Sequence, residues 1–417
     1  MNSPVFTASS DGLRVENVAL PTIAAQFGTP CFVYSRRALT EAYQALDAAL
    51  GDLPHMICYS IKANSNLAIL NLFARLGSGF DIVSGGELQR VNAAGGQTDK
   101  IVFSGLGKTD EEMRLALKLG IACFNVESES ELRRLNTLAG EMGKRAPVSV
   151  RVNPDVDPKT HPYIATGLKE NNFGVAFRDA RRVYRIAADC PHLRVVGIDC
   201  HIGSQITELS PFRDAFTKVL ALVDELAGDG VILQHVDLGG GLGIRYRDEQ
   251  PVALADYASA IRAAIGSRPL KVMLEPGRSL VGNAGVLLTQ ARFLKPGDER
   301  HFAIVDAAMN DLLRPALYEA WHEVLPVRPR AEGARRWEIV GPVCESADFL
   351  AQGRELALAE GDLLAVMSAG AYGMSMSSNY NSRPRAAEVM VDGDRAHLVR
   401  ARESIEALYA LEQPLPD

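Results

Sequence analysis

The sequence predicts an α/β fold: a (β/α)8 barrel followed by a mostly antiparallel β domain. Between residues 56 and 274, eight short apolar runs alternate with helix-length amphipathic segments, which is typical of parallel strands joined by helical crossovers. This length approaches the roughly 250 residues of a typical barrel. After about Gly282 the alternation stops, and short strands separated by Gly, Pro and charged turns follow. An open doubly wound sheet would also alternate strands and helices, but the uninterrupted count of eight favours the barrel.

Taken in order, residues 1–30 are expected to form strands that pack with the β domain, and residues 37–50 a helix. The expected barrel strands are Met56–Ile61, Gly79–Val83, Ile101–Phe103, Ala122–Val126, Val148–Val152, Val195–Cys200, His235–Leu238 and Val272–Leu274. The expected helices between them are Leu67–Leu76, Glu87–Ala94, Asp110–Leu119, Glu129–Met142, Ala180–Ala188, Pro211–Leu226 and Leu254–Ile265. The expected domains are therefore residues 1–30, a barrel over 31–282, and a β domain over 283–417.

The second domain is expected to contain a short helix near Asp311–Glu323. Its expected strands are Val286–Phe293, His301–Val305, Trp337–Val340, Asp362–Val366, Glu388–Val391 and Arg395–Val399. Crossover helices of barrel length are absent from this part of the sequence, so the strands are expected to pair mainly antiparallel.

Composition narrows the class of protein. With 44 Lys+Arg against 51 Asp+Glu, the net charge is −7, which argues against general binding to nucleic acid or to an anionic membrane. The six cysteines are scattered without a CxxC pair, as expected for a reduced cytoplasm. We see no signal peptide and no apolar run of transmembrane length, so a cytoplasmic protein is expected.

Polar residues follow nearly every expected barrel strand. The carboxyl ends of parallel barrel strands meet at one mouth, where barrel enzymes keep their chemistry. These residues are Lys62, Asp81, Ser84, Ser104, Glu127, Arg151, Asn153, His201, Ser204, Gly239, Gly240, Gly241, Glu275 and Arg278. Lys62 alone could be a lysine that snorkels to the surface, but at a mouth it is also a candidate amine nucleophile.

Two stretches at the predicted mouth suggest a phosphate and a buried carboxylate. The run Gly239-Gly240-Gly241 follows the seventh strand, where backbone N–H groups can close on an anion without Cβ obstruction. Glu275 and Arg278 follow the eighth strand. They could form a structural ion pair, or they could act separately, Glu275 on a protonated ring nitrogen and Arg278 on a phosphate or carboxylate.

Further candidates are His201, which is aimed at the same mouth as Lys62, and Ser204, which could donate to a phosphate. Three polar stretches stand out in the second domain. They are Arg314 with Tyr318, Cys344 with Glu345, and Tyr372 between Ala371 and Gly373. The sequence contains no HExxH motif and no Cys/His cluster, so no metal is expected.

These stretches resemble, in the same order, those of the alanine-racemase-like (fold type III) pyridoxal-phosphate decarboxylases. The resemblance covers about the whole chain. The segments that carry it are Tyr59–Asn64, Phe80–Glu87, Arg151–Pro154, Thr166–Gly174, His201–Gln205, Gly239–Gly241, Glu275–Arg278, Cys344–Ser346 and Tyr372–Gly373.

The resemblance implies roles around a pyridoxal 5'-phosphate cofactor. Lys62 would carry the cofactor covalently, Glu275 would keep its ring nitrogen protonated, and His201 would lie against the ring face. Asp81 is expected beside the cofactor as well. The candidates for the phosphate are Ser204, Gly239, Gly240, Gly241, Gly277, Arg278 and Tyr372.

By the same resemblance the reaction is decarboxylation of meso-2,6-diaminopimelate to L-lysine and CO2. Arg278, Arg314 and Tyr318 would bind the distal carboxylate of the substrate, with Tyr372 nearby. Glu345 would bind the distal ammonium. Cys344 would be the proton donor by this resemblance, while the sequence leaves open whether Cys344 or Lys62 delivers the proton. With Glu345, Cys344 would reach across a homodimer into the neighbouring subunit's site. Two alternatives stay open: a decarboxylase of lysine, ornithine or a carboxylated polyamine, and a catalytically silent cofactor-binding homologue.

Overall fold

The computed structural model of the chain describes residues 5–161, 166–167, 172–331 and 333–416. The chain divides into two compact units. The barrel unit contains residues 42–244 and 250–279, and the β unit contains the residues up to Glu41, Arg245–Glu249 and the residues from Leu280 onward. No helix within the described ranges is long and apolar enough to cross a membrane.

The barrel unit is a closed ring of eight parallel strands, so the prediction of a barrel is confirmed. Pairing runs β9-β11-β12-β13-β5-β6-β7-β8, and the ring closes because β8 also pairs with β9. The strands are β5 (His55–Ser60), β6 (Gly79–Ile82), β7 (Ile101–Phe103), β8 (Cys123–Val126), β9 (Ala146–Asn153), β11 (Leu193–Asp199), β12 (His235–Asp237) and β13 (Lys271–Leu274). A short β10 (Val175–Ala176) pairs with the end of β9 and is not one of the eight strands of the ring.

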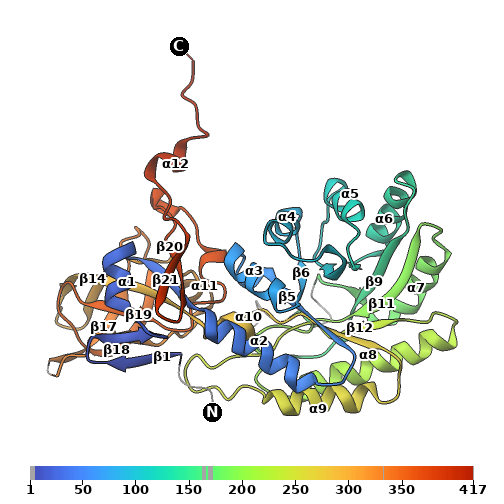
Figure 1. Cartoon of the computed structure of the whole chain (residues 1–417), viewed down its shortest axis with the longest axis horizontal. Helices are drawn as coiled ribbons and strands as arrows, with labels where there is room; N and C mark the ends of the chain where they lie inside the picture. The colour runs from blue at the N-terminus through green and yellow to red at the C-terminus, as the bar shows by residue number, and fades with distance from the viewer. Residues whose placement is uncertain (1–4, 162–165, 168–171, 332, 417) are drawn as a thin grey trace. The chain divides into compact units, whose positions relative to one another are not determined.

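The crossover helices lie within a few residues of their predicted positions and surround the strands (Figure 1). They are α3 (Leu67–Arg75), α4 (Gly85–Ala93), α5 (Asp110–Leu119), α6 (Glu129–Glu141), α7 (Ala180–Asp189), α8 (Ser210–Gly228) and α9 (Leu254–Ile265). Ser84, Thr109 and Ser128 cap the N-termini of α4, α5 and α6 by accepting a backbone N–H. Ser84 follows the end of β6, as predicted, and its hydroxyl serves as the cap of α4.

Apolar side chains fill the inside of the barrel beneath the mouth. Cys58, Val102, Cys123, Val196 and Met273 form a buried cluster from five different strands. Burial raises the pKa of the Cys58 and Cys123 thiols well above their ordinary range, so both act as small apolar residues.

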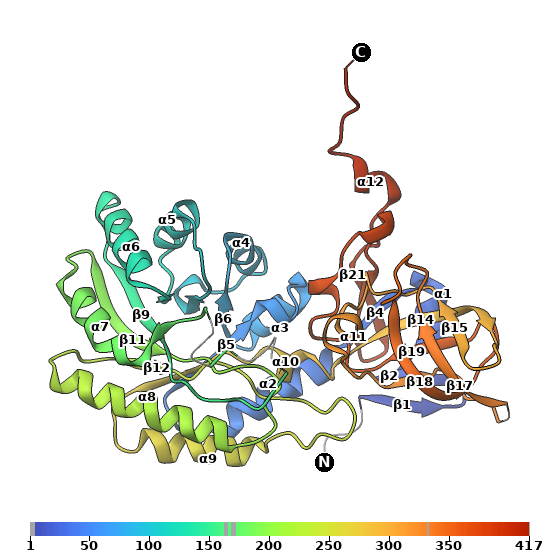
Figure 2. The same cartoon turned by 180° about the vertical axis from the view of Figure 1, so that it is seen from behind.

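The β unit contains a mostly antiparallel sheet of nine strands (Figure 2). They are β4 (Cys31–Ser35), β14 (Gly285–Lys295), β15 (His301–Val305), β16 (Val324–Pro326), β17 (Ala334–Val340), β18 (Phe349–Ala357), β19 (Leu363–Val366), β20 (Ala387–Asp392) and β21 (Arg395–Arg400). The pairs β15–β17 and β4–β20 are parallel, and the other pairs are antiparallel. This confirms the predicted class of the second sheet.

Strand β4 differs from the sequence-based division of the chain. The predicted barrel begins at residue 31, yet Cys31–Ser35 pairs with β14 and β20 in the second sheet. The N-terminal strands β1 (Phe6–Ser9), β2 (Gly12–Val15) and β3 (Val18–Ala19) form a small sheet of their own. Side chains from that sheet and from α1 (Leu20–Phe27) join β4, β14 and β20 in one apolar core.

Candidate active site

Lys62 lies at the mouth of the barrel, just beyond β5, in the 3-10 turn Ile61–Ala63. Its Nζ donates to Asp81 Oδ2 at 2.7 Å, and Ser60 Oγ donates to the same oxygen at 2.6 Å. The Asp81 side chain is fully buried, whereas the Lys62 side chain is 38% exposed. The amine is therefore held at a fixed place but remains accessible from the mouth.

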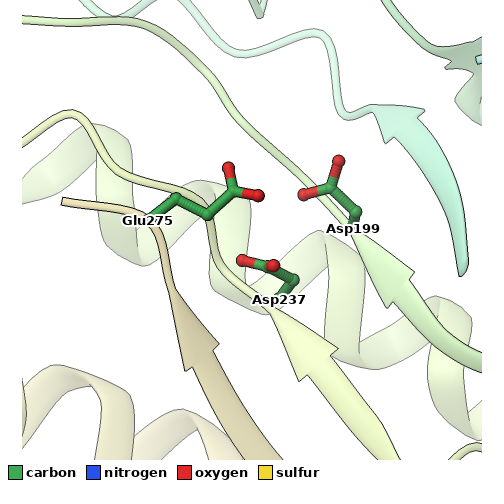
Figure 3. A group of neighbouring side chains, drawn as sticks. All are labelled: Asp199, Asp237 and Glu275. Carbon is green, nitrogen blue, oxygen red and sulfur yellow. The ribbon is translucent and has the colours of Figure 1, made fainter. Parts of the chain in front are cut away.

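Three carboxylates converge beside this pair at the ends of β11, β12 and β13 (Figure 3). One oxygen each of Asp199, Asp237 and Glu275 lies within 4.8 Å of the others, and all three residues are buried. Glu275 accepts weak hydrogen bonds from Ser104 Oγ at 3.2 Å and from Asn125 Nδ2 at 3.4 Å. Within the described residues this trio is the grouping with metal-ligand spacing, which the sequence analysis did not foresee.

Burial and mutual repulsion oppose full ionisation of this carboxylate trio. Burial, reinforced by the charge of Asp237, raises the pKa of both Asp199 and Glu275 well above the ordinary range. Burial also raises the pKa of Asp237 to about 7. At neutral pH the trio therefore retains protons, and a protonated nitrogen placed against Glu275 would relieve the repulsion.

A second group of charged side chains lies next to the trio, and in it Arg151 forms an ion pair with Glu127. Arg151 donates from Nη1 to Glu127 Oε1 at 2.9 Å, and its Nε lies 3.9 Å from Asp199 Oδ2. The guanidinium also stacks on the ring of Phe173, with its carbon 4.8 Å from the ring centroid. Arg151 is thus the cation nearest to Asp199 among the ion pairs of the described residues, and none of those ion pairs includes Glu275.

His201 is held by the glycine run. Its Nδ1 accepts the N–H of Gly240 at 3.1 Å, so the neutral imidazole carries its proton on Nε2. Burial lowers the pKa of His201 well below its ordinary value, and the nearby charge of Arg151 adds to this effect. The ring is therefore a neutral aromatic face at the mouth.

The glycine run is packed too tightly to accept side chains. A Cβ on Gly240 would lie 2.2 Å from the carbonyl oxygen of Glu275, and one on Gly241 would lie 2.7 Å from that of Gly203. The N–H of Gly239 donates to Asp237 Oδ1 at 2.9 Å, and that of Gly240 is used by His201. In the described part of the chain no acceptor is assigned to the N–H of Gly241, which is therefore the donor of the run best placed for a ligand.

Arg278 and Ser204 face each other at the same rim. Arg278 donates from Nη2 to Ser204 Oγ at 3.0 Å. Glu275 accepts hydrogen bonds from Ser104 and Asn125, so these hydrogen bonds of the two side chains go to different partners. Their separate roles on a ring nitrogen and on a phosphate or carboxylate stay a prediction. Gly277 lies beneath them, where a Cβ would be 3.0 Å from Ala63 Cβ and 3.1 Å from Ser60 Cβ. The rim thus combines an arginine, a hydroxyl and close-packed backbone, the usual components of a phosphate site.

Cys344 and Glu345 of the β unit lie on an exposed loop. The loop is tied to the 3-10 turn Tyr380–Ser382. The N–H of Cys344 donates to Asn381 Oδ1 at 2.8 Å, and the hydroxyl of Tyr380 donates to Glu345 Oε2 at 3.0 Å. Thiol and carboxylate are therefore presented on a braced surface rather than used in the core of their own unit.

Arg314 and Tyr318 begin and end α11 (Arg314–Tyr318), one helical turn apart as predicted. This is the short helix predicted near Asp311–Glu323. Arg314 is only 6% exposed. Tyr372 is partly buried and has a left-handed φ of 56°, a strained backbone that is frequently found at functional sites.

Comparison with known proteins agrees with this geometry. Residues 36–282 match the family described as "Pyridoxal-dependent decarboxylase, pyridoxal binding domain". The chain is 61% identical to diaminopimelate decarboxylase of Pseudomonas aeruginosa and 58% identical to that of Vibrio cholerae, with 99% of both chains covered in each case. A crystal structure of diaminopimelate decarboxylase from Helicobacter pylori complexed with L-lysine is 42% identical, with a TM-score of 0.92 over 94% of this chain and 99% of that one.

The barrel and its mouth thus define the class of the protein, a pyridoxal-dependent decarboxylase with a closed parallel barrel and a separate β unit. Within that class, the chain belongs to the diaminopimelate decarboxylase family.

The residues of the mouth fit pyridoxal phosphate. A lysine that can bind an aldehyde, buried carboxylates that require a cation, and an arginine–serine rim for a phosphate lie on one barrel. Asp199 Oδ1 and Asp237 Oδ2 are buried without a hydrogen-bond partner among the described residues, which again fits a cationic group at this place. Of the motif Thr166–Gly174, residues 168–171 lie outside the described residues.

Sequence reasoning missed several residues around the site. Asp199 and Asp237 end their strands as single acids, and only the pairing of β11 with β12 and of β12 with β13 brings them to Glu275. Ser60 and Lys62 both donate to Asp81. Ser60 precedes the lysine by two residues, and this short spacing is the sequence signal that could have identified it. Tyr380 and Asn381 carry no local motif that links them to Cys344 and Glu345.

Proposed function

We propose that this chain removes CO2 from meso-2,6-diaminopimelate and releases L-lysine, with pyridoxal phosphate bound at the barrel mouth. The observation that carries the proposal is the combination, on one barrel, of an accessible lysine, buried carboxylates and a phosphate rim. Relatives at 58–61% identity over 99% of this chain are named diaminopimelate decarboxylase, which supports the choice of substrate.

In the proposed arrangement Lys62 would bind the cofactor covalently, and Asp81 holds its free amine in place at the mouth. When bound, the cofactor supplies an electron sink for the electron pair left by departing CO2. Glu275 would accept a hydrogen bond from the protonated ring nitrogen, and His201 would lie against the ring. Ser204, Gly241, Gly277, Arg278 and Tyr372 bind the phosphate. Gly239 and Gly240 shape that site rather than donate to it, since their N–H groups serve Asp237 and His201.

Residues of the β unit are proposed to select the substrate. Arg314 and Tyr318, with Arg278, bind the distal carboxylate, with Tyr372 nearby, and Glu345 binds the distal ammonium. A substrate that lacks either group leaves a charge unpaired, which penalises lysine and ornithine. Cys344 holds the proton that replaces CO2 on the reacting carbon.

We further propose a homodimer in which Cys344 and Glu345 complete the neighbouring subunit's site. Their exposure on a loop that is held by Tyr380 and Asn381 supports this role, because neither side chain is buried in the core of its own unit. Six free cysteines and a net charge of −7 support a cytoplasmic enzyme that does not use nucleic acid or a membrane as partner.

The proposal is tested at Lys62. The variant Lys62→Ala is expected to lose the visible absorbance of bound cofactor and all measurable turnover. Lys62→Arg keeps a cation for Asp81 and serves as the matched control for folding. It is expected to retain the thermal stability of the native protein and to be equally inactive. Normal turnover in either variant would contradict the proposal.

A further inference from the structure

A buried histidine holds Arg314 in place. His322 is 0% exposed, and its Nε2 lies 2.8 Å from Arg314 Nη1. The Arg314 guanidinium carbon lies 4.4 Å above the ring of Tyr246, and the same tyrosine meets the imidazole edge-on at 5.3 Å. We call Tyr246, Arg314 and His322 the arginine clamp. All three residues belong to the β unit, and Tyr246 follows the glycine run by five residues.

The contacts of His322 fix its protonation. Its Nδ1 lies 2.8 Å from the carbonyl oxygen of Met367, which can only accept, so Nδ1 carries the proton. Arg314 can only donate, so Nε2 must offer its lone pair. His322 is therefore a neutral imidazole with one defined tautomer. Protonation at Nε2 would set two donors against each other in a buried position.

The imidazole is itself rigidly mounted. The carbonyl oxygen of His322 accepts from Arg354 Nη2 at 2.8 Å, and the Arg354 guanidinium stacks on Trp321 with its carbon 3.2 Å from the ring centroid. The backbone and both ring nitrogens of His322 are thus engaged. A neutral acceptor held this firmly directs the guanidinium without cancelling its charge, which an aspartate or glutamate at the same place would do.

We infer that His322 is a positioning residue that aims Arg314 at the distal carboxylate of the substrate. The inference rests on the proposed function, in which Arg314 binds that carboxylate. His322 accepts one N–H of Arg314, and Tyr246 covers the flat face of the guanidinium. These two contacts fix the orientation of the planar guanidinium. Preorganisation of this kind strengthens binding of a carboxylate without a new contact to it.

Two polar variants separate this role from packing. In His322→Gln the amide oxygen can replace Nε2 as acceptor for Arg314, whereas in His322→Asn the shorter side chain reaches only the Met367 carbonyl. The probes are L-lysine, which keeps one intact amino-acid end, and 1,5-diaminopentane, which lacks the carboxylate. Both are measured as competitive inhibitors of CO2 release from diaminopimelate by the holoenzyme.

We expect His322→Asn to raise the KM for diaminopimelate by about tenfold to a hundredfold, with kcat within about threefold of the native value. It should remove the preference for L-lysine over 1,5-diaminopentane, and His322→Gln should restore both the KM and the preference. Arg314→Gln is the reference variant, and it should abolish the preference by itself.

Each outcome is decisive. If Arg314→Gln leaves the inhibitor preference intact, Arg314 does not bind the carboxylate and the proposed function of that residue fails. If Arg314→Gln abolishes the preference but His322→Asn keeps it, the inference about His322 is wrong while the proposed function stands. A loss of kcat and thermal stability in both His322 variants, with the preference unchanged, would likewise assign His322 to the fold and overturn the inference.

Discussion

Replacing Asp237 by Asn should make the cofactor-free protein more stable at alkaline pH. Asp237 is fully buried beside Asp199 and Glu275, and burial raises its pKa from 3.8 to about 7. Between these two values the folded protein binds more protons than the unfolded chain, so the free energy of unfolding falls as pH rises from about 4 to about 7 and then levels off. Asn carries no charge at any pH, and its Oδ1 can still accept the N–H of Gly239.

The pKa gap sets the size of the effect. A difference of about 3 in pKa, at about 1.4 kcal/mol per pKa unit, corresponds to a penalty of up to about 4 kcal/mol in the native protein above pH 7. Urea denaturation of the cofactor-free native protein and of Asp237→Asn at pH 5, 6, 7 and 8 measures it. The stability advantage of the variant should grow with pH and shrink when pyridoxal phosphate supplies a cation. Parallel pH profiles, or a variant less stable than the native protein at pH 8, would refute this account of the trio.

Three further outcomes follow from the site. Gly240→Ala should weaken cofactor binding at least about tenfold and destabilise the fold by about 1–3 kcal/mol, since its Cβ would lie 2.2 Å from the Glu275 carbonyl oxygen. Cofactor titration and thermal melts check this, and Gly86→Ala is the control because its Cβ meets nothing closer than 3.7 Å. Arg314→Ala should lower kcat/KM for diaminopimelate by about a hundredfold or more while the Kd for cofactor stays unchanged; equal losses would place Arg314 in the fold. Tyr380→Phe should raise the KM about twofold to fivefold through its exposed hydrogen bond to Glu345, and an unchanged KM would exclude that support.

The barrel was predictable because its signal is local and repeated. Each crossover pairs a short apolar strand with a helix of clear amphipathic period, and α5 (Asp110–Leu119) even begins at a capping box formed by Thr109 and Glu112. Strand β18 (Phe349–Ala357) was missed for the opposite reason. Its pairing with β17 shifts register, and Gly353 in a left-handed conformation interrupts the alternation that marks a strand.

The site was predictable where one residue type implies one chemistry. Lys62, the glycine run and Glu275 can each be recognised as candidates from a few neighbouring residues. The structure places Lys62 Nζ 2.7 Å from Asp81 Oδ2. Asp237 and His322 act only through neighbours that lie 38 and 8 positions away, Glu275 and Arg314. A lone acid at a strand end or a lone histidine is usually a solvated or satisfied residue, so only the folded chain reveals such partnerships.

Release of CO2 from diaminopimelate, lysine, ornithine and arginine, measured side by side with the purified holoenzyme, tests the central claim most directly. We expect kcat/KM for diaminopimelate to exceed that for each of the other amino acids by about a thousandfold or more, because each leaves a charged group of the substrate site unpaired. The L-lysine formed should equal the CO2 released. Comparable rates with lysine or ornithine, or no CO2 from diaminopimelate, would contradict the claim.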